Sequence, residues 1–344
     1  KSRCFMKRVT VFFDRLKLIT DHKKIKNYCA LECKFIKENY STFASQRKTF
    51  TKYRNYLKNF YFQDLKINNA IADIKLLKKV LSIPTVTYKE DLMVEFLCEW
   101  LEKNSIPFFV DKNKNVYATK GKLGENEYYP CVVSHTDTVH TLKTMKIKEE
   151  LLPNAQKDLK RSFKAYDIFG YPTGIGGDDK CGVFACLKLL RELPYLKAAF
   201  FVSEETGCHG SRAADKKFFS NVGYAIQFDA PENWMVSESC SGQILFDRNS
   251  DFFNACDQVL CENMDKRDME YMSHPYTDVY ALKTSFDFSC INFSIGYYNY
   301  HTKNEYVVIE DVFTGIEMVK QMIESLGNTF HEHKPKTERW MLWD

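Results

Sequence analysis

Acidic side chains and histidines gather where short apolar segments of this sequence end. They are His135 and Asp137 after YYPCVVS, Asp178 and Asp179 in GIGGDDKCG, Glu204 and Glu205 after AAFFVS, Asp229 after VGYAIQF, and His301 and Glu305 beyond CINFSIG. A single aspartate in such a place usually forms a turn or caps a helix. The whole set is different, because carboxylates and imidazoles are side chains that bind divalent cations. These residue types therefore indicate metal chemistry.

A pair of divalent metal ions suits this set. Several carboxylates in one crevice repel one another and raise each other's pKa, so cations must balance them. Two such ions, with zinc the expected metal, lower the pKa of a shared water and polarise a substrate carbonyl. One further carboxylate must then carry a proton from the water to the leaving amine. The neighbours Glu204 and Glu205 supply both a ligand and this base, because adjacent side chains at a strand end diverge.

Alternating strands and helices must position these side chains. The apolar runs before them are typical of buried parallel strands, and amphipathic helical patterns separate the runs. Helices are predicted over AIADIKLLKKVLSI, which Pro84 ends, over TVTYKEDLMVEFLCEWLEKN with Thr87 as N-cap, and over 309–326. The segments PFFVD and NVYATKG predict a strand pair. The fold class is therefore α/β, a mostly parallel mixed sheet sandwiched by helices. In such folds the ligand site lies beyond the carboxyl ends of the strands.

Charge divides the 344-residue chain into unequal parts. Residues 1–70 hold 17 Lys and Arg against 5 Asp and Glu, which leaves 32 basic and 40 acidic residues in the remainder. The predicted organisation is a basic, aromatic-rich helical extension over 1–68, a catalytic domain over 69–330 and a C-terminal tail over 331–344. Basic residues among aromatics can bind nucleic acid. The extension shows no nucleic-acid-binding motif, however, so we favour aromatics packed on the main domain and solvated lysines.

Several classes of protein are excluded by composition. Apolar residues make up 44% and charged residues 27% of the chain, which is ordinary for a globular protein. No apolar run approaches the roughly 18 residues that span a bilayer, and the first residues do not read as a secretory signal, so we expect no membrane partner. The 12 cysteines lack the spacing of a zinc ribbon or redox motif. Free thiols in a reducing cytoplasm are the expected state.

The ordered motifs resemble those of the co-catalytic zinc exopeptidases (metallopeptidase clan MH). That group includes peptidase T-like tripeptidases, glutamate carboxypeptidases, aminoacylases and zinc aminopeptidases. The resemblance runs from about Leu76 to Leu326 and rests on His-Thr-Asp, Gly-Gly-Asp-Asp-Lys-Cys-Gly, Glu-Glu-Thr-Gly, Phe-Asp-Ala-Pro and His-Thr-Lys-Asn-Glu in that order. It implies a three-layer fold and a site that holds two zinc ions.

The resemblance also implies a role for each motif residue. His135 and Asp229 would bind one metal, Glu205 and His301 the other, Asp178 would bridge both, Asp137 would orient the His135 ring, and Glu204 would be the general base. The peptide bond after the bridging aspartate is often cis in the family. Glu305 matches a nearby acidic position to which no role is assigned, and loop or packing roles are expected for His140.

The expected function is that of an exopeptidase, an aminopeptidase or tripeptidase that hydrolyses small peptides. Many relatives carry a lid domain between the aspartate ligand and the last histidine; only 72 residues separate Asp229 from His301, so we expect a catalytic domain without a lid. One alternative keeps the chemistry and changes the substrate, a zinc amidohydrolase that deacylates N-acyl amino acids. A remote alternative is a nucleic-acid-binding protein that uses the basic segment. The oligomeric state stays open.

Overall fold

The computed structural model describes residues 69–141, 145–153 and 159–334. Contacts divide the chain into two units after Ala70, and the second unit carries every predicted site residue. The predicted extension over 1–68 lies outside the described residues, as does the tail beyond residue 334.

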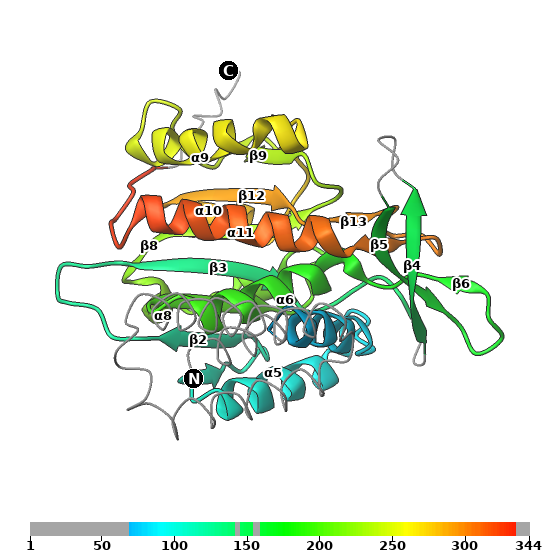
Figure 1. Ribbon diagram of the computed structural model, residues 1–344. Helices are drawn as coiled ribbons and strands as arrows, with labels where there is room; N and C mark the ends of the chain where they lie inside the picture. Colours follow the sequence, from blue (N-terminus) through cyan, green and yellow to red (C-terminus); the bar gives the residue numbers. More distant parts are fainter. Residues whose placement is uncertain (1–68, 142–144, 154–158, 335–344) are drawn as a thin grey trace, which may run out of the picture. The chain divides into compact units, whose positions relative to one another are not determined.

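A nine-stranded mixed sheet forms the centre of the unit (Figure 1). Its order is β1 (Phe108–Val110), β2 (Val116–Lys120), β7 (Leu196–Phe201), β3 (Tyr129–His135), β8 (Val222–Ala230), β12 (Ser289–Ser294), β9 (Met235–Cys240) and β10 (Gln243–Ile244), with β11 (Glu270–His274) paired to β9. The four strands β7, β3, β8 and β12 are parallel to one another. Every residue of these four is buried, as their continuous apolar sequences predict.

Helices flank this sheet, which confirms the predicted α/β class. They are a helix over 69–81, α5 (Asp91–Lys103), α6 (Gly177–Glu192), α7 (His209–Arg212), α8 (Lys216–Phe219), α9 (Asp251–Arg267), α10 (Asp278–Ser285) and α11 (Ile309–Leu326). The closing helix has the predicted bounds, and it packs beside α6, which covers β3 and β8 (Figure 1). No helix in the described ranges is long and apolar enough to cross a membrane.

A second, smaller sheet contains strands that the sequence did not predict. It consists of β13 (Tyr297–Tyr298), β14 (Tyr306–Val308), β5 (Leu159–Tyr166), β4 (Lys146–Pro153) and β6 (Pro172–Thr173). Figure 1 shows it beyond the carboxyl end of β3. Its longest strands, β4 and β5, lie in the sequence between His135 and Asp178, so this sheet is connected directly to the predicted site. The segment between Asp229 and His301 supplies β9 to β12 of the main sheet, the helices α9 and α10, and β13 of the smaller sheet.

The predicted N-cap of the second helix is wrong in an informative way. That helix begins at Asp91. The Thr87 hydroxyl donates to Asp137 Oδ2 at 2.8 Å, and Glu90 accepts from the backbone N–H of Ser203 at 3.0 Å. Tertiary contacts with loops at the strand ends have therefore replaced the local capping interactions.

Candidate metal and catalytic centre

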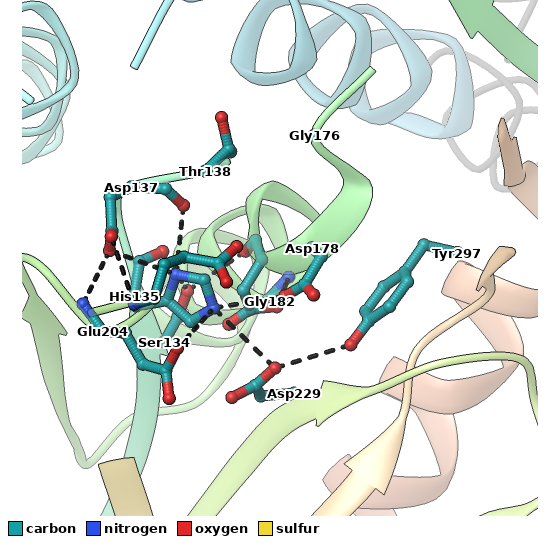
Figure 2. Close-up of polar contacts among 12 residues, drawn as sticks. Ser134, His135, Asp137, Thr138, Gly176, Asp178, Gly182, Glu204, Asp229 and Tyr297 are labelled. Carbon is teal, nitrogen blue, oxygen red and sulfur yellow. Dashed lines mark hydrogen bonds and ion pairs between the residues drawn. The ribbon is translucent and has the colours of Figure 1, made fainter. Parts of the chain in front are cut away.

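The structure brings the five predicted metal ligands together at the carboxyl ends of the parallel strands. His135 is the last residue of β3, Asp178 lies at the start of α6, Glu205 follows β7, Asp229 lies near the end of β8, and His301 follows β13. Three ligand atoms, from His135, Glu204 and Asp229, lie within 4.8 Å of one another, and so do three from His135, Asp178 and Glu205. Chain segments far apart in sequence therefore meet in one small volume (Figure 2).

Asp178 lies between the two histidines. Its Oδ1 is 3.2 Å from Nε2 of His135, and its Oδ2 is 3.2 Å from Nε2 of His301. The two oxygens of one carboxylate thus face two different imidazoles. A carboxylate in this position can bridge two cations, each of which is also reached by one histidine.

Each histidine has further carboxylates around it. Nε2 of His135 is 3.7 Å from Oδ1 of Asp229 and 3.9 Å from Oε2 of Glu204. Nε2 of His301 is 3.0 Å from Oε2 of Glu205. The donors therefore divide into two groups that share Asp178, which is the arrangement expected of two adjacent divalent ions.

The electrostatics of the centre call for positive charge. Burial raises the pKa of Glu205 and Asp229, and nearby carboxylates add to the effect. Burial, opposed by His135, raises the pKa of Glu204 to about 9. Lys180 is fully buried nearby, but its ammonium group donates to the carbonyls of Leu81 and Ile175. The oxygen and nitrogen donors thus fit divalent cations, which would balance charges that the described side chains leave largely uncompensated.

The pKa values of the two imidazoles are also raised. Burial opposes protonation of His135, but its contacts with Asp137 and Asp178 outweigh burial and raise its pKa. Contacts with Asp178 and Glu205 raise the pKa of His301 to about 10. The same two imidazoles hold the pKa of Asp178 below its usual range, against its burial. In the metal-free site, protons on the two histidines supply the positive charge that metal ions would otherwise supply to the carboxylates.

Asp137 connects the His135 ring to the segment that carries the two glutamates. Its Oδ1 is 3.4 Å from Nδ1 of His135, whose closer neighbour is the Asp137 carbonyl at 3.1 Å. Oδ1 also accepts from the backbone N–H of Glu204 at 2.9 Å, and Oδ2 accepts from that of Glu205 at 3.3 Å (Figure 2). One buried carboxylate therefore fixes the ring of a predicted ligand and the backbone of the predicted base.

The two adjacent glutamates point to different partners, as their positions after β7 led us to expect. Glu204 is 9% exposed, and its Oε1 accepts from the Cys208 thiol at 3.3 Å. Its other oxygen faces His135, whereas Glu205 faces His301. The two neighbouring carboxylates thus face different histidines.

Several residues that support Asp229 were missed by sequence reasoning. Gln227 Nε2 donates to Asp229 Oδ2 at 3.1 Å and to Asp278 Oδ2 at 3.3 Å. The Tyr297 hydroxyl donates to Asp229 Oδ1 at 3.4 Å, and Asn292 bonds both the N–H and the carbonyl of the same residue. Gln227 and Asn292 carry a sequence signal, since an amide is unusual inside a buried strand.

The backbone at the start of α6 places the Asp178 carboxylate. The peptide bond between Asp178 and Asp179 is cis, as the resemblance implied. Gly176 has φ +68°, and a Cβ there would lie 2.7 Å from Thr138 Cγ2. Asp179 Oδ1 accepts from the N–H of Gly182 at 2.9 Å, which closes the first turn of the regular helix. The glycines of this loop therefore allow the close approach that places the Asp178 carboxylate.

A cleft of about 430 Å³ opens over the donor groups. Its lining consists of Asp178, Glu204, Glu205, Gly207, Asp229, Pro231, His274, Pro275, Tyr276, Tyr297, Tyr300 and His301. The lining thus combines acidic groups with histidine, tyrosine and proline, and it includes no lysine or arginine.

Stability of the metal-free protein should fall as pH rises from about 5 to about 9. Glu204 keeps its proton up to about pH 9 in the folded chain but loses it near 4.5 when unfolded, so the folded state binds more protons across this window. His301 acts in the same direction, between pH 6.5 and about 10.

Bound zinc should raise stability. At about 100 times its Kd, zinc would add about 2.7 kcal/mol to the free energy of unfolding, or about 5–10 °C to the Tm. Thermal melts with and without zinc measure this, and a metal-free Tm that rises with pH would contradict it.

No protein-family model matches the sequence. Solved structures do match the fold. The aminopeptidase PepT from Bacillus cereus is 12% identical with a TM-score of 0.61, over 75% of this chain and 98% of that chain. A tripeptidase from Staphylococcus aureus is 12% identical with a TM-score of 0.58, over 74% and 98%. The TET1 peptidase from Pyrococcus horikoshii is 14% identical with a TM-score of 0.53, over 73% and 98%. At these identities the likeness establishes a shared fold.

Proposed function

We propose that this chain is a two-metal exopeptidase, an aminopeptidase that hydrolyses small peptides. The observation that carries the proposal is Asp178, whose two oxygens face His135 and His301 at the meeting point of two donor groups. Three solved structures with this fold are named as an aminopeptidase, a tripeptidase and a peptidase, which supports the same reaction class.

His135 and Asp229 would hold one divalent ion and His301 and Glu205 the other, with Asp178 shared, and zinc is the metal that this donor set suits best. When bound, such ions lower the pKa of an attacking water and polarise the scissile carbonyl. The protein's own part is to hold these donors in one geometry and to keep all of them except the exposed His301 ring largely out of bulk water.

Glu204 would move the proton in this reaction. Its carboxylate faces His135 from the cleft, at the end of a backbone that Asp137 fixes. It accepts the proton of the attacking water and delivers it to the leaving amine, so it ends each turnover in its starting state. Asp137 would act by orientation, since it holds the His135 ring and the Glu204 backbone together.

The cleft favours a substrate with a free amino terminus. None of its lining residues is a lysine or arginine that could pair with the carboxylate of an N-acyl amino acid. An N-acyl amino acid presents a carboxylate and no ammonium group. This charge pattern favours the aminopeptidase over the deacylase.

A panel of small amides should separate these two substrates. Dipeptides and tripeptides with a free amino terminus are expected to be hydrolysed at least about 10-fold faster, in kcat/KM, than the same peptides acetylated at that terminus, the difference that about 1.4 kcal/mol of binding makes. N-acetyl amino acids should be the poorest substrates. Release of free amino acid, followed by chromatography, measures each rate. Faster turnover of the N-acyl compounds would assign the deacylase.

A further inference from the structure

Glu305 was left without a role, yet it is among the most completely bonded carboxylates of the described chain. It is 1% exposed. Its Oε2 accepts from the backbone N–H of Gly176 at 2.8 Å, and its Oε1 accepts from the backbone N–H of Asp178 at 3.2 Å. The carboxylate of Glu305 thus bonds the backbone of Asp178, the proposed bridging residue, and the backbone of the loop that leads to it.

His140, from a third segment of the chain, forms another hydrogen bond with Glu305. Its Nε2 lies 2.6 Å from Oε2 of Glu305. Because a carboxylate only accepts, the proton of this bond lies on His140 Nε2. The ring also packs on the loop, since a Cβ at Gly174 would lie 1.9 Å from its Cε1.

Each of the three joined segments carries metal-site residues. His140 follows His135 and Asp137 by a few residues, the glycine loop carries Asp178, and Glu305 lies four residues after His301. The contacts lie behind the cleft, because neither Glu305 nor His140 lines it. A charged acceptor with two backbone donors and one imidazole donor is strong and directional, so it sets the relative positions of these segments.

We propose that Glu305, held by His140, is a positioning residue that locks the bridging carboxylate of Asp178 between the two donor groups and so fixes both metal sites at once. This inference rests on the proposed function. The role of Glu305 differs from those of Asp229 and Glu205, because each of these two residues belongs to a single donor group. Loss of the hydrogen bonds of Glu305 should weaken both metal-binding steps together, because both donor groups share Asp178.

Glutamine cannot replace this carboxylate. All three donors need an acceptor, and they are divided between its two oxygens. A glutamine supplies one acceptor oxygen, so its NH₂ group must face either Asp178 N–H or the pair Gly176 N–H and His140 Nε2. Either orientation places donor against donor in a buried site.

The test is calorimetric titration of zinc into metal-free protein, using the wild type, Glu305→Gln and His140→Ala. Glu305→Gln should weaken both binding steps about 10- to 100-fold, as loss of outer partners does at metal sites. His140→Ala removes one of the three bonds and should weaken both steps less. Peptide hydrolysis by Glu305→Gln should recover when zinc is raised in proportion to the lost affinity, because Glu204 and the ligands are unchanged.

Asp167→Asn is the matched control. Asp167 also accepts from two backbone N–H groups, of Phe169 and Tyr171, but in the turn between β5 and β6, so its loss should leave zinc affinity unchanged. Wild-type affinity in both Glu305→Gln and His140→Ala, or weakening of one step alone, would overturn the proposal while the proposed function stands. If Glu305→Gln does not fold, His140→Ala decides. A wild type that binds no zinc pair would overturn the function and this inference together.

Discussion

Replacing Glu204 with glutamine is expected to reduce peptide hydrolysis by about 10²- to 10⁴-fold, the usual contribution of a positioned general acid–base group. Glutamine keeps the size of the side chain and cannot take a proton from the attacking water. The contacts of the Glu204 backbone with Asp137 do not depend on the side chain, so the fold and the donor groups should be retained. Turnover of a tripeptide at saturating zinc measures the loss.

Metal content separates this outcome from damage to the site. Glu204→Gln should retain nearly the zinc content of the wild type, because the proposed ligands His135, Asp178 and Asp229 are unchanged. Glu238→Gln offers a control, since Glu238 pairs with Arg248 and does not line the cleft. Wild-type turnover in Glu204→Gln would show that another group moves the proton.

Replacing Asp178 with asparagine is expected to have a larger effect, because one oxygen of the shared group becomes an NH₂ donor. That donor must face the ligands of one site, so the variant loses a negative charge and a donor atom where two cations would lie. Zinc affinity should fall by about 100-fold or more at both sites. Hydrolysis should fall by more than the roughly 10⁴-fold that loss of a general base can cause.

Zinc content after dialysis distinguishes Asp178 from ligands of a single site. Asp229→Asn should keep about one ion per chain, because Asp229 lies only with His135. Asp178→Asn should keep almost none. If Asp178→Asn keeps two ions, the bridging role is wrong, whatever its activity.

The sequence predicted the elements and residues that continuous patterns specify. The buried parallel strands have unbroken apolar runs, and α11 has apolar residues at helical spacing from Ile309 to Leu326. Because the carboxyl ends of parallel strands meet, the residues after them could be grouped without coordinates. Of the predicted ligands, His135, Glu205 and Asp229 lie at the ends of such strands, whereas Asp178 and His301 follow strands of the smaller sheet.

Features held by distant partners were not predictable in this way. β4 and β5 alternate single apolar side chains with many charges, such as Ile147 among lysines, so their pattern resembles a polar loop. Thr87 fits an N-cap by local preference, but its partner is Asp137, 50 residues away. Glu305 is likewise defined by Asp178, 127 residues earlier. Local sequence carries no signal for such pairings.

The central claim is that two divalent ions lie on either side of Asp178. Anomalous diffraction from crystals grown with zinc, recorded on both sides of the zinc absorption edge, tests it most directly. We expect two peaks about 3.5–4 Å apart, one beside His135 and Asp229 and the other beside His301 and Glu205. A single peak, or peaks away from Asp178, would contradict it.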